Sequence, residues 1–139
     1  MKTTIFTVLL ASLIATPSLA NNLTILVQNA GPAGEIRAAI FDTQKGFATR
    51  TSVKERKKNP TNGKVAITFK GLKPGTYGIA VFQDKNGNKK LDSNLFGIPN
   101  EPYGFSKNPK IGLKAPTFEK FSFSFDGQPK KLIITLNGS

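Results

Sequence analysis

The sequence predicts an all-β protein, an antiparallel β-sandwich of about six to eight strands. Short segments alternate apolar and polar residues, which is the period-two pattern of half-buried strands. Clusters of Gly, Pro, Asn and Asp separate these segments, and none of them shows sustained helical spacing. Such strands bury their apolar faces when two sheets pack together, and eleven Phe residues are available to fill the core. A closed barrel is the structural alternative.

Six segments carry the alternation, in chain order. Their apolar positions are Leu23, Ile25 and Val27; Ile36, Ala38 and Ile40; Val65, Ile67 and Phe69; Tyr77, Ile79 and Val81; Phe121, Phe123 and Phe125; and Leu132, Ile134 and Leu136. Residues 126–129, with the sequence Asp-Gly-Gln-Pro, join the last two segments over a short span. Such a connection favours an antiparallel hairpin of those two strands.

Two stretches do not fit as strands. Residues 45–63 are rich in Lys and Arg and poor in apolar residues, so we expect a solvated connection with one short helical turn at most. Residues 93–117 contain four prolines, which cannot donate to a strand ladder. Apolar residues such as Phe96, Ile98 and Leu113 recur there, so we expect a long ordered loop pinned to the sandwich by these side chains.

The first twenty residues have the features of a secretory signal peptide. Lys2 precedes an apolar run over residues 5–15, and a small-x-small pattern ends at Ala20. The run is shorter than the roughly 20 residues that a transmembrane helix needs, and no later segment is long and apolar enough to be one. We therefore expect cleavage after Ala20, a single domain over residues 21–139, and a periplasmic or secreted protein.

The composition excludes several kinds of chemistry. The chain has no His and no Cys, so it can form no disulfide, thiolate metal site, Cys nucleophile or Ser-His-Asp triad. The carboxylates of Asp84, Asp92 and Glu101 lie among Lys, Asn and Gly, a setting that suits ionised oxygens better than a proton shuttle. We therefore expect no catalytic residues and no enzymatic activity.

One segment has the spacing of a calcium loop, with oxygen side chains at positions 1, 3, 5 and 9 and a backbone carbonyl at position 7. The candidate ligands are Asp84, Asn86, Asn88, Asp92, the carbonyl of Lys90, and Glu101 if the long loop folds back. Position 12 is Leu95 instead of an acid and position 6 is Lys89 instead of Gly, so we expect weak affinity, about 10⁻⁴ to 10⁻³ M. In the alternative interpretation the Asp and Asn side chains bond their own backbone as Asx turns, with no ion.

The net charge of the whole chain is +12, which suggests an anionic partner. Candidate partners are an envelope component or an anionic polymer such as lipopolysaccharide or a cell-wall polymer. A solvated basic surface without a partner is the favoured explanation of the charge, because charged runs on loops are usually solvated. No aromatic residue lies within the basic run at residues 54–58, and the protein is expected to be exported, so we expect no nucleic-acid partner. We expect a monomer. Residues 103–105, Tyr-Gly-Phe, suit either an aromatic ligand surface or buried loop anchors.

Three strings together resemble an exported bacterial family, domain-of-unknown-function family 2141: Phe69–Tyr77, Phe82–Asp92 and Phe96–Ser106. The resemblance covers essentially all of residues 21–139. The first string is also similar to the strand entry of transthyretin-like and carboxypeptidase regulatory-type domains, which implies an immunoglobulin-like or prealbumin-like sandwich. The second is similar to the calcium loop of bacterial surface-adhesin B-type repeats, which have an acid near position 12. Fold resemblance implies no reaction or ligand.

Together these features predict a non-catalytic exported module that serves a binding or structural role at the bacterial cell envelope, with a calcium ion as its candidate cofactor. The alternative is a basic module that binds an anionic polymer without metal.

Overall fold

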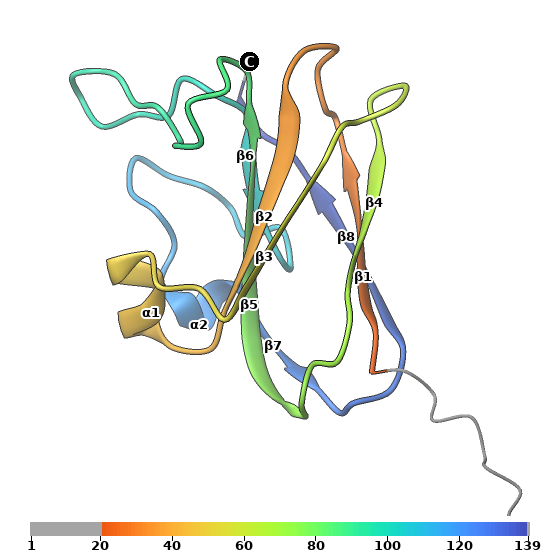
Figure 1. The fold of residues 1–139 in the computed structure, drawn as a ribbon. Helices are drawn as coiled ribbons and strands as arrows, with labels where there is room; N and C mark the ends of the chain where they lie inside the picture. The colour runs from red at the N-terminus through yellow and green to blue at the C-terminus, as the bar shows by residue number, and fades with distance from the viewer. Residues whose placement is uncertain (1–20, 139) are drawn as a thin grey trace, which may run out of the picture.

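The computed structural model describes residues 21–138, which form a sandwich of two β-sheets (Figure 1). In chain order the elements are β1 (Leu23–Gln28), β2 (Glu35–Phe41), α1 (Gln44–Thr49), β3 (Lys54–Lys58), β4 (Val65–Phe69), β5 (Gly75–Asp84), β6 (Tyr103–Phe105), α2 (Phe118–Phe121), β7 (Ser122–Phe125) and β8 (Lys130–Thr135). The predicted all-β sandwich of six to eight strands is confirmed. The expected signal peptide lies outside the described residues.

The smaller sheet has three strands in the order β4-β1-β8. β1 pairs with β4 in antiparallel register and with β8 in parallel register. Parallel neighbours need a long connection, and here nearly the whole domain lies between the two strands. The predicted hairpin across residues 126–129 is therefore wrong, because β7 pairs with β5 in the other sheet.

The larger sheet has the order β3-β2-β5-β6, and β7 pairs with one end of β5. The central pair β2–β5 runs from Glu35 opposite Asp84 to Phe41 opposite Gly78. At one edge the two sheets are joined by backbone hydrogen bonds between Tyr103 and Asn137, which follows β8. This bridge closes one side of the sandwich.

The core lies between the sheets and is built from the alternating apolar positions of the strands. Its fully buried members include Leu23, Ile25, Val27, Ile36, Ile40, Phe69, Leu72, Ile79 and Ile134. Each is the inward residue of a strand or of an adjoining turn, as period-two patterning requires.

A second apolar cluster covers one end of the outer face of the larger sheet. Its rings are those of Phe41, Phe47, Phe105, Phe118 and Phe121, which come from β2, α1, β6 and α2 and pack mostly edge to face. Gly78 permits this packing, because a Cβ atom there would lie 2.5 Å from the Phe121 ring. Five of the ten Phe residues within residues 21–138 therefore fill a cluster outside the sandwich core.

Two segments that were expected to lack strands contain one each. β3 lies within residues 45–63 and pairs with β2, while β6 lies within residues 93–117 and pairs with β5. The apolar residues expected to anchor the long loop differ in burial. Phe105 is buried, whereas Phe96 and Leu113 are largely exposed. Within the described chain, no helix is long and apolar enough to cross a bilayer.

Candidate functional site

The predicted ion ligands gather in the loop that follows β5, here called the Asp84–Asp92 loop. Asn86 and Asp92 are joined side chain to side chain, with 2.6 Å between Asn86 Nδ2 and Asp92 Oδ2. Asn88 Nδ2 lies 2.8 Å from both carboxylate oxygens of Asp92. The Oδ1 atom of Asn86 accepts from the backbone N–H of Asn88, and that of Asn88 accepts from the N–H of Lys90. These are the Asx turns of the alternative interpretation, and they coexist with the calcium-loop register.

Asp84 is the buried end of this loop, with only 1% of its surface exposed. Its Oδ2 accepts from the backbone N–H of Lys89 at 2.9 Å and lies 4.0 Å from the Arg37 guanidinium. Its Oδ1 is buried without any hydrogen-bond partner. A buried carboxylate oxygen that accepts nothing is costly, because it has lost its water without replacement.

Glu101 folds back over the loop, which is the condition under which it was predicted to be a ligand. It is 4% exposed, and its two carboxylate oxygens accept from the backbone N–H groups of Lys85 at 2.8 Å and Asp92 at 3.1 Å. The carboxylate thus holds both ends of the Asp84–Asp92 loop together. Lys90, which was predicted to supply a carbonyl, contributes its N–H to the Asx turn of Asn88.

Lys89, at position 6 of the loop, has a left-handed backbone conformation that lysine rarely adopts. Lys89 has φ 66°, in the left-handed region where calcium loops place glycine. Within residues 21–138, no group of three or more His, Cys, Asp or Glu side chains is placed to hold a metal ion. An ion in this loop would therefore depend on amide and backbone oxygens in addition to carboxylates.

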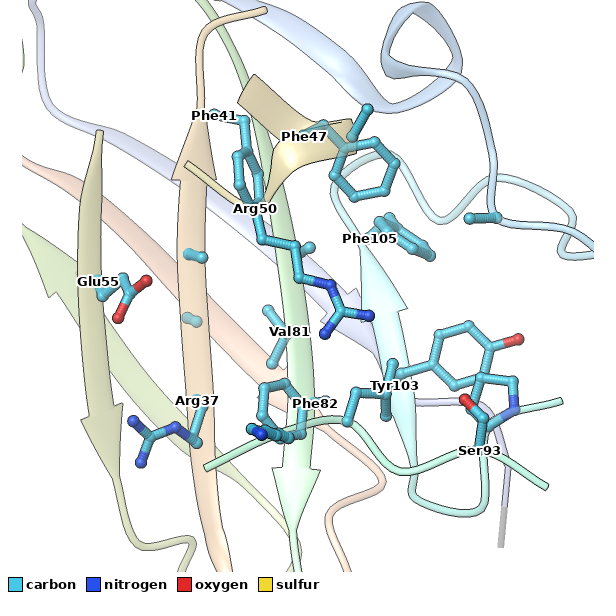
Figure 2. A pocket seen from close by; sticks show the side chains of 18 of the residues that line it. Arg37, Phe41, Phe47, Arg50, Glu55, Val81, Phe82, Ser93, Tyr103 and Phe105 are labelled. Carbon is cyan, nitrogen blue, oxygen red and sulfur yellow. The ribbon is translucent and has the colours of Figure 1, made fainter. Parts of the chain in front are cut away.

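A second candidate site is a cavity of about 820 Å³ on the outer face of the larger sheet, here called the basic pocket (Figure 2). Its floor contains Ala39 of β2 and Ala80 of β5, which are paired in register. Two methyl groups at the centre of a sheet face that elsewhere carries Phe and Arg leave a hollow. Segments around Pro99 and Leu113 complete its border.

Aromatic side chains form the walls of the basic pocket. They are Phe41, Phe47, Phe82, Tyr103 and Phe105. Burial raises the pKa of the Tyr103 phenol above its ordinary value, and its hydroxyl can donate a hydrogen bond. Aromatic and apolar walls with a few polar groups are typical of small-molecule sites, and the volume falls in their usual range.

Cations dominate the rim of this pocket. Seven of the described residues that line it are basic: Arg37, Arg50, Arg56, Lys57, Lys89, Lys90 and Lys114. Glu55 is the one carboxylate among the described lining residues. Arg37 and Lys57 pair with Glu35, and Glu55 accepts from Ser52. The rim therefore keeps a marked excess of positive charge.

Arg50 is the most distinctive residue of the rim. It ends α1 with φ 56°, a left-handed conformation that glycine usually takes at this position. Figure 2 shows its side chain extending across the pocket toward Tyr103. A strained backbone position that carries a cation into a cavity points to a functional demand on that cation.

The sequence predicted part of this second site. Residues 103–105 were predicted to form either an aromatic ligand surface or buried loop anchors. Tyr103 and Phe105 both line the pocket, and Phe105 is also buried. Phe47, Arg50 and the floor alanines were missed. The small outward residues Ala39 and Ala80 were the available signal. They indicate a hollow only when it is known that their two strands pair.

Comparison with known proteins places the chain near one family. A family model described as "Uncharacterized protein conserved in bacteria (DUF2141)" matches residues 27–133. This range includes the Asp84–Asp92 loop and every residue of the basic pocket. No curated protein and no solved structure gave a significant match.

Proposed function

Since the chain belongs to the bacterial DUF2141 family, we propose that it is a non-catalytic binding module of the cell envelope. Its ligand in this proposal is an anionic molecule with an apolar body, held in the basic pocket. The envelope location rests on the signal-peptide features of residues 1–20.

The observation that carries the proposal is the combination of an apolar floor, aromatic walls and a cationic rim in one cavity. An apolar body would displace water from the floor at Ala39 and Ala80, which stabilises binding in proportion to the area covered. The anionic group would then lie near Arg50, whose guanidinium can donate two parallel hydrogen bonds to a carboxylate, sulfonate or phosphate.

The first prediction uses the anionic aromatic dye 1-anilinonaphthalene-8-sulfonate as the probe. Arg50→Gly should weaken its binding about tenfold, because the cation over the cavity is lost. The same change should leave the fold intact or stabilise it by about 1 kcal/mol, because glycine accepts the left-handed backbone. Arg50→Lys should keep part of the affinity, because the charge remains while the two parallel hydrogen bonds of the guanidinium are lost.

Filling the floor provides the matched comparison. Ala39→Leu should abolish dye binding, whereas Ala66→Leu, at an exposed position of β4 on the other sheet, should not change it. Fluorescence titration measures affinity and urea unfolding checks folding. If Ala39→Leu binds as tightly as the unaltered protein, the pocket is not the site. Dextran sulfate is an anionic polymer without an apolar body. If it binds the Ala39→Leu variant as tightly as the unaltered protein, the alternative function, binding of an anionic polymer, is supported.

A second candidate function, calcium binding by the Asp84–Asp92 loop, is favoured by the partnerless Oδ1 of Asp84. A cation would give this buried oxygen the partner it lacks. The Asx-turn bonds of Asn86 and Asn88 do not compete with an ion, because each carbonyl oxygen has two lone pairs. The opposing features are the nearby Arg37 and the lysines of the loop.

The second prediction is that millimolar calcium raises the melting temperature relative to EDTA. At about 10 mM calcium, roughly 10 to 100 times the expected dissociation constant, the free energy of unfolding should rise by about 1.4 to 2.7 kcal/mol. Asp92→Asn should lose most of this shift, while Asp42→Asn, an equal charge change at an exposed position before α1, should retain it. Identical melting curves with and without calcium would leave the loop as a self-bonded turn.

A further inference from the structure

Large apolar side chains are concentrated on two loops beside the basic pocket. Leu95 is fully exposed, Phe96 is 86% exposed and Leu113 is 87% exposed. Leu95 and Phe96 lie between the Asp84–Asp92 loop and β6, and Leu113 lies between β6 and α2. We call these two places the apolar tips. Exposed apolar groups gathered in one region of a protein mark an interaction surface more often than isolated ones do.

The first apolar tip is held in an ordered turn. Asn94 Oδ1 accepts from the backbone N–H groups of Phe96 at 2.9 Å and Ile98 at 3.0 Å. The backbone N–H of Asn94 donates to the Ile98 carbonyl, and that of Gly97, with φ 76°, donates to the Asn94 carbonyl. These bonds satisfy the turn internally and leave Leu95 and Phe96 directed into solvent.

Both tips are on the same side of the protein. Figure 1 shows the two loops projecting from the sandwich on the side of α1 and α2. Gly97 and Pro99 of the first loop and Leu113 of the second all line the basic pocket, so the tips flank it. A flat partner that met both tips would lie over the pocket.

The charge around the tips is positive. Lys107, Lys110 and Lys114 are exposed, and Lys89 and Lys90 lie on the pocket rim. Glu101 is the one acid between Ser93 and Phe118, and it is buried against the Asp84–Asp92 loop. Exposed Leu and Phe between exposed lysines are complementary to a surface with anionic headgroups above an apolar layer.

We infer that the apolar tips dock this protein onto an anionic lipid bilayer, with Leu95, Phe96 and Leu113 entering the boundary between headgroups and acyl chains. The lysines near the tips then face lipid phosphates. Apolar insertion and electrostatic attraction add together, which is how peripheral proteins reach stable membrane binding without a spanning segment. This docking does not require that the pocket hold a ligand.

The chain has no Trp, so Phe96→Trp introduces a single fluorescent reporter at the first tip. Its emission should shift to the blue and be quenched by brominated acyl chains in vesicles that contain phosphatidylglycerol. Pure phosphatidylcholine vesicles should give a much smaller change, and high salt should weaken the effect, because headgroup attraction is screened. Ile133→Trp on β8, which is 54% exposed on the smaller sheet, should show no quenching.

Co-sedimentation of the purified protein with the same vesicles tests the tips directly. The double variant Leu95→Ser, Leu113→Ser should lower the partition coefficient onto the vesicles at least about tenfold. Ile133→Ser should leave the partition coefficient unchanged. The inference is overturned if the unaltered protein does not sediment with anionic vesicles, or if the double variant sediments equally well. Ala39→Leu should retain vesicle binding while it loses the dye, so failure of the pocket proposal is distinguishable from failure of this one.

Discussion

At the scale of single residues, buried polar side chains hold the connections of this fold in place. Gln83 is fully buried in β5, and its amide bonds the turn between β1 and β2: Oε1 accepts from Gly31 at 2.7 Å, and Nε2 donates to the carbonyls of Gly31 and Ala33. Ser106 has a comparable role, because its hydroxyl accepts from the N–H of Ile79 and donates to the carbonyl of Phe121. In each case one side chain supplies the hydrogen-bond partners that these backbone groups do not find in a helix or a strand ladder.

Gln83→Leu tests this role at nearly constant volume. Three backbone groups lose their partner, so the free energy of unfolding should fall by about 2 to 3 kcal/mol. Urea unfolding should show a lower midpoint with an unchanged slope. Gln128→Leu, in an exposed turn, is the control and should change stability by less than about 0.5 kcal/mol. Equal effects of the two changes would contradict the assigned role.

At the scale of elements, β3 and the Asp84–Asp92 loop show how polar segments acquire fixed structure. β3 is an edge strand with four of its five residues exposed, so no alternation reveals it, and its lysines protect the edge from pairing with another chain. The loop is ordered by a residue outside it, because the Glu101 carboxylate accepts from the backbone N–H groups of Lys85 and Asp92. In both cases the partner lies outside the segment itself.

Glu101→Gln tests the brace on the loop. An amide offers one acceptor and one donor where two N–H groups need acceptors, so one hydrogen bond is lost and the free energy of unfolding should fall by about 1 to 3 kcal/mol. Hydrogen exchange at the amides of Lys85 and Asp92 should accelerate more than exchange in β1. Glu119→Gln on α2 removes the same charge at an exposed site and should leave both amides protected. Unchanged exchange in Glu101→Gln would refute the brace.

At the scale of the whole molecule, the larger sheet has two different covered faces. Its inner face packs on the smaller sheet, and its outer face carries the aromatic cluster at one end and the basic pocket beside it. α1 and α2 are too short to be stable alone and are held by Phe47 and Phe121, whose ring centroids are 4.9 Å apart. Pocket, loop and apolar tips thus lie around one face, and the membrane inference would orient that face toward lipid.

The sequence by itself determined six of the eight strand segments, the all-β class and the spacing of the oxygen side chains in the Asp84–Asp92 loop. Each depends on neighbours in the chain: alternation in Leu23, Ile25 and Val27 reports a buried face, and Asx turns form over two residues. Only the tertiary structure decided that β8 pairs with β1, that Glu101 reaches the loop, and that Ala39 faces Ala80 below Arg50. A local pattern shows that a side chain is buried but does not identify its partner, because partners are selected by packing between distant segments.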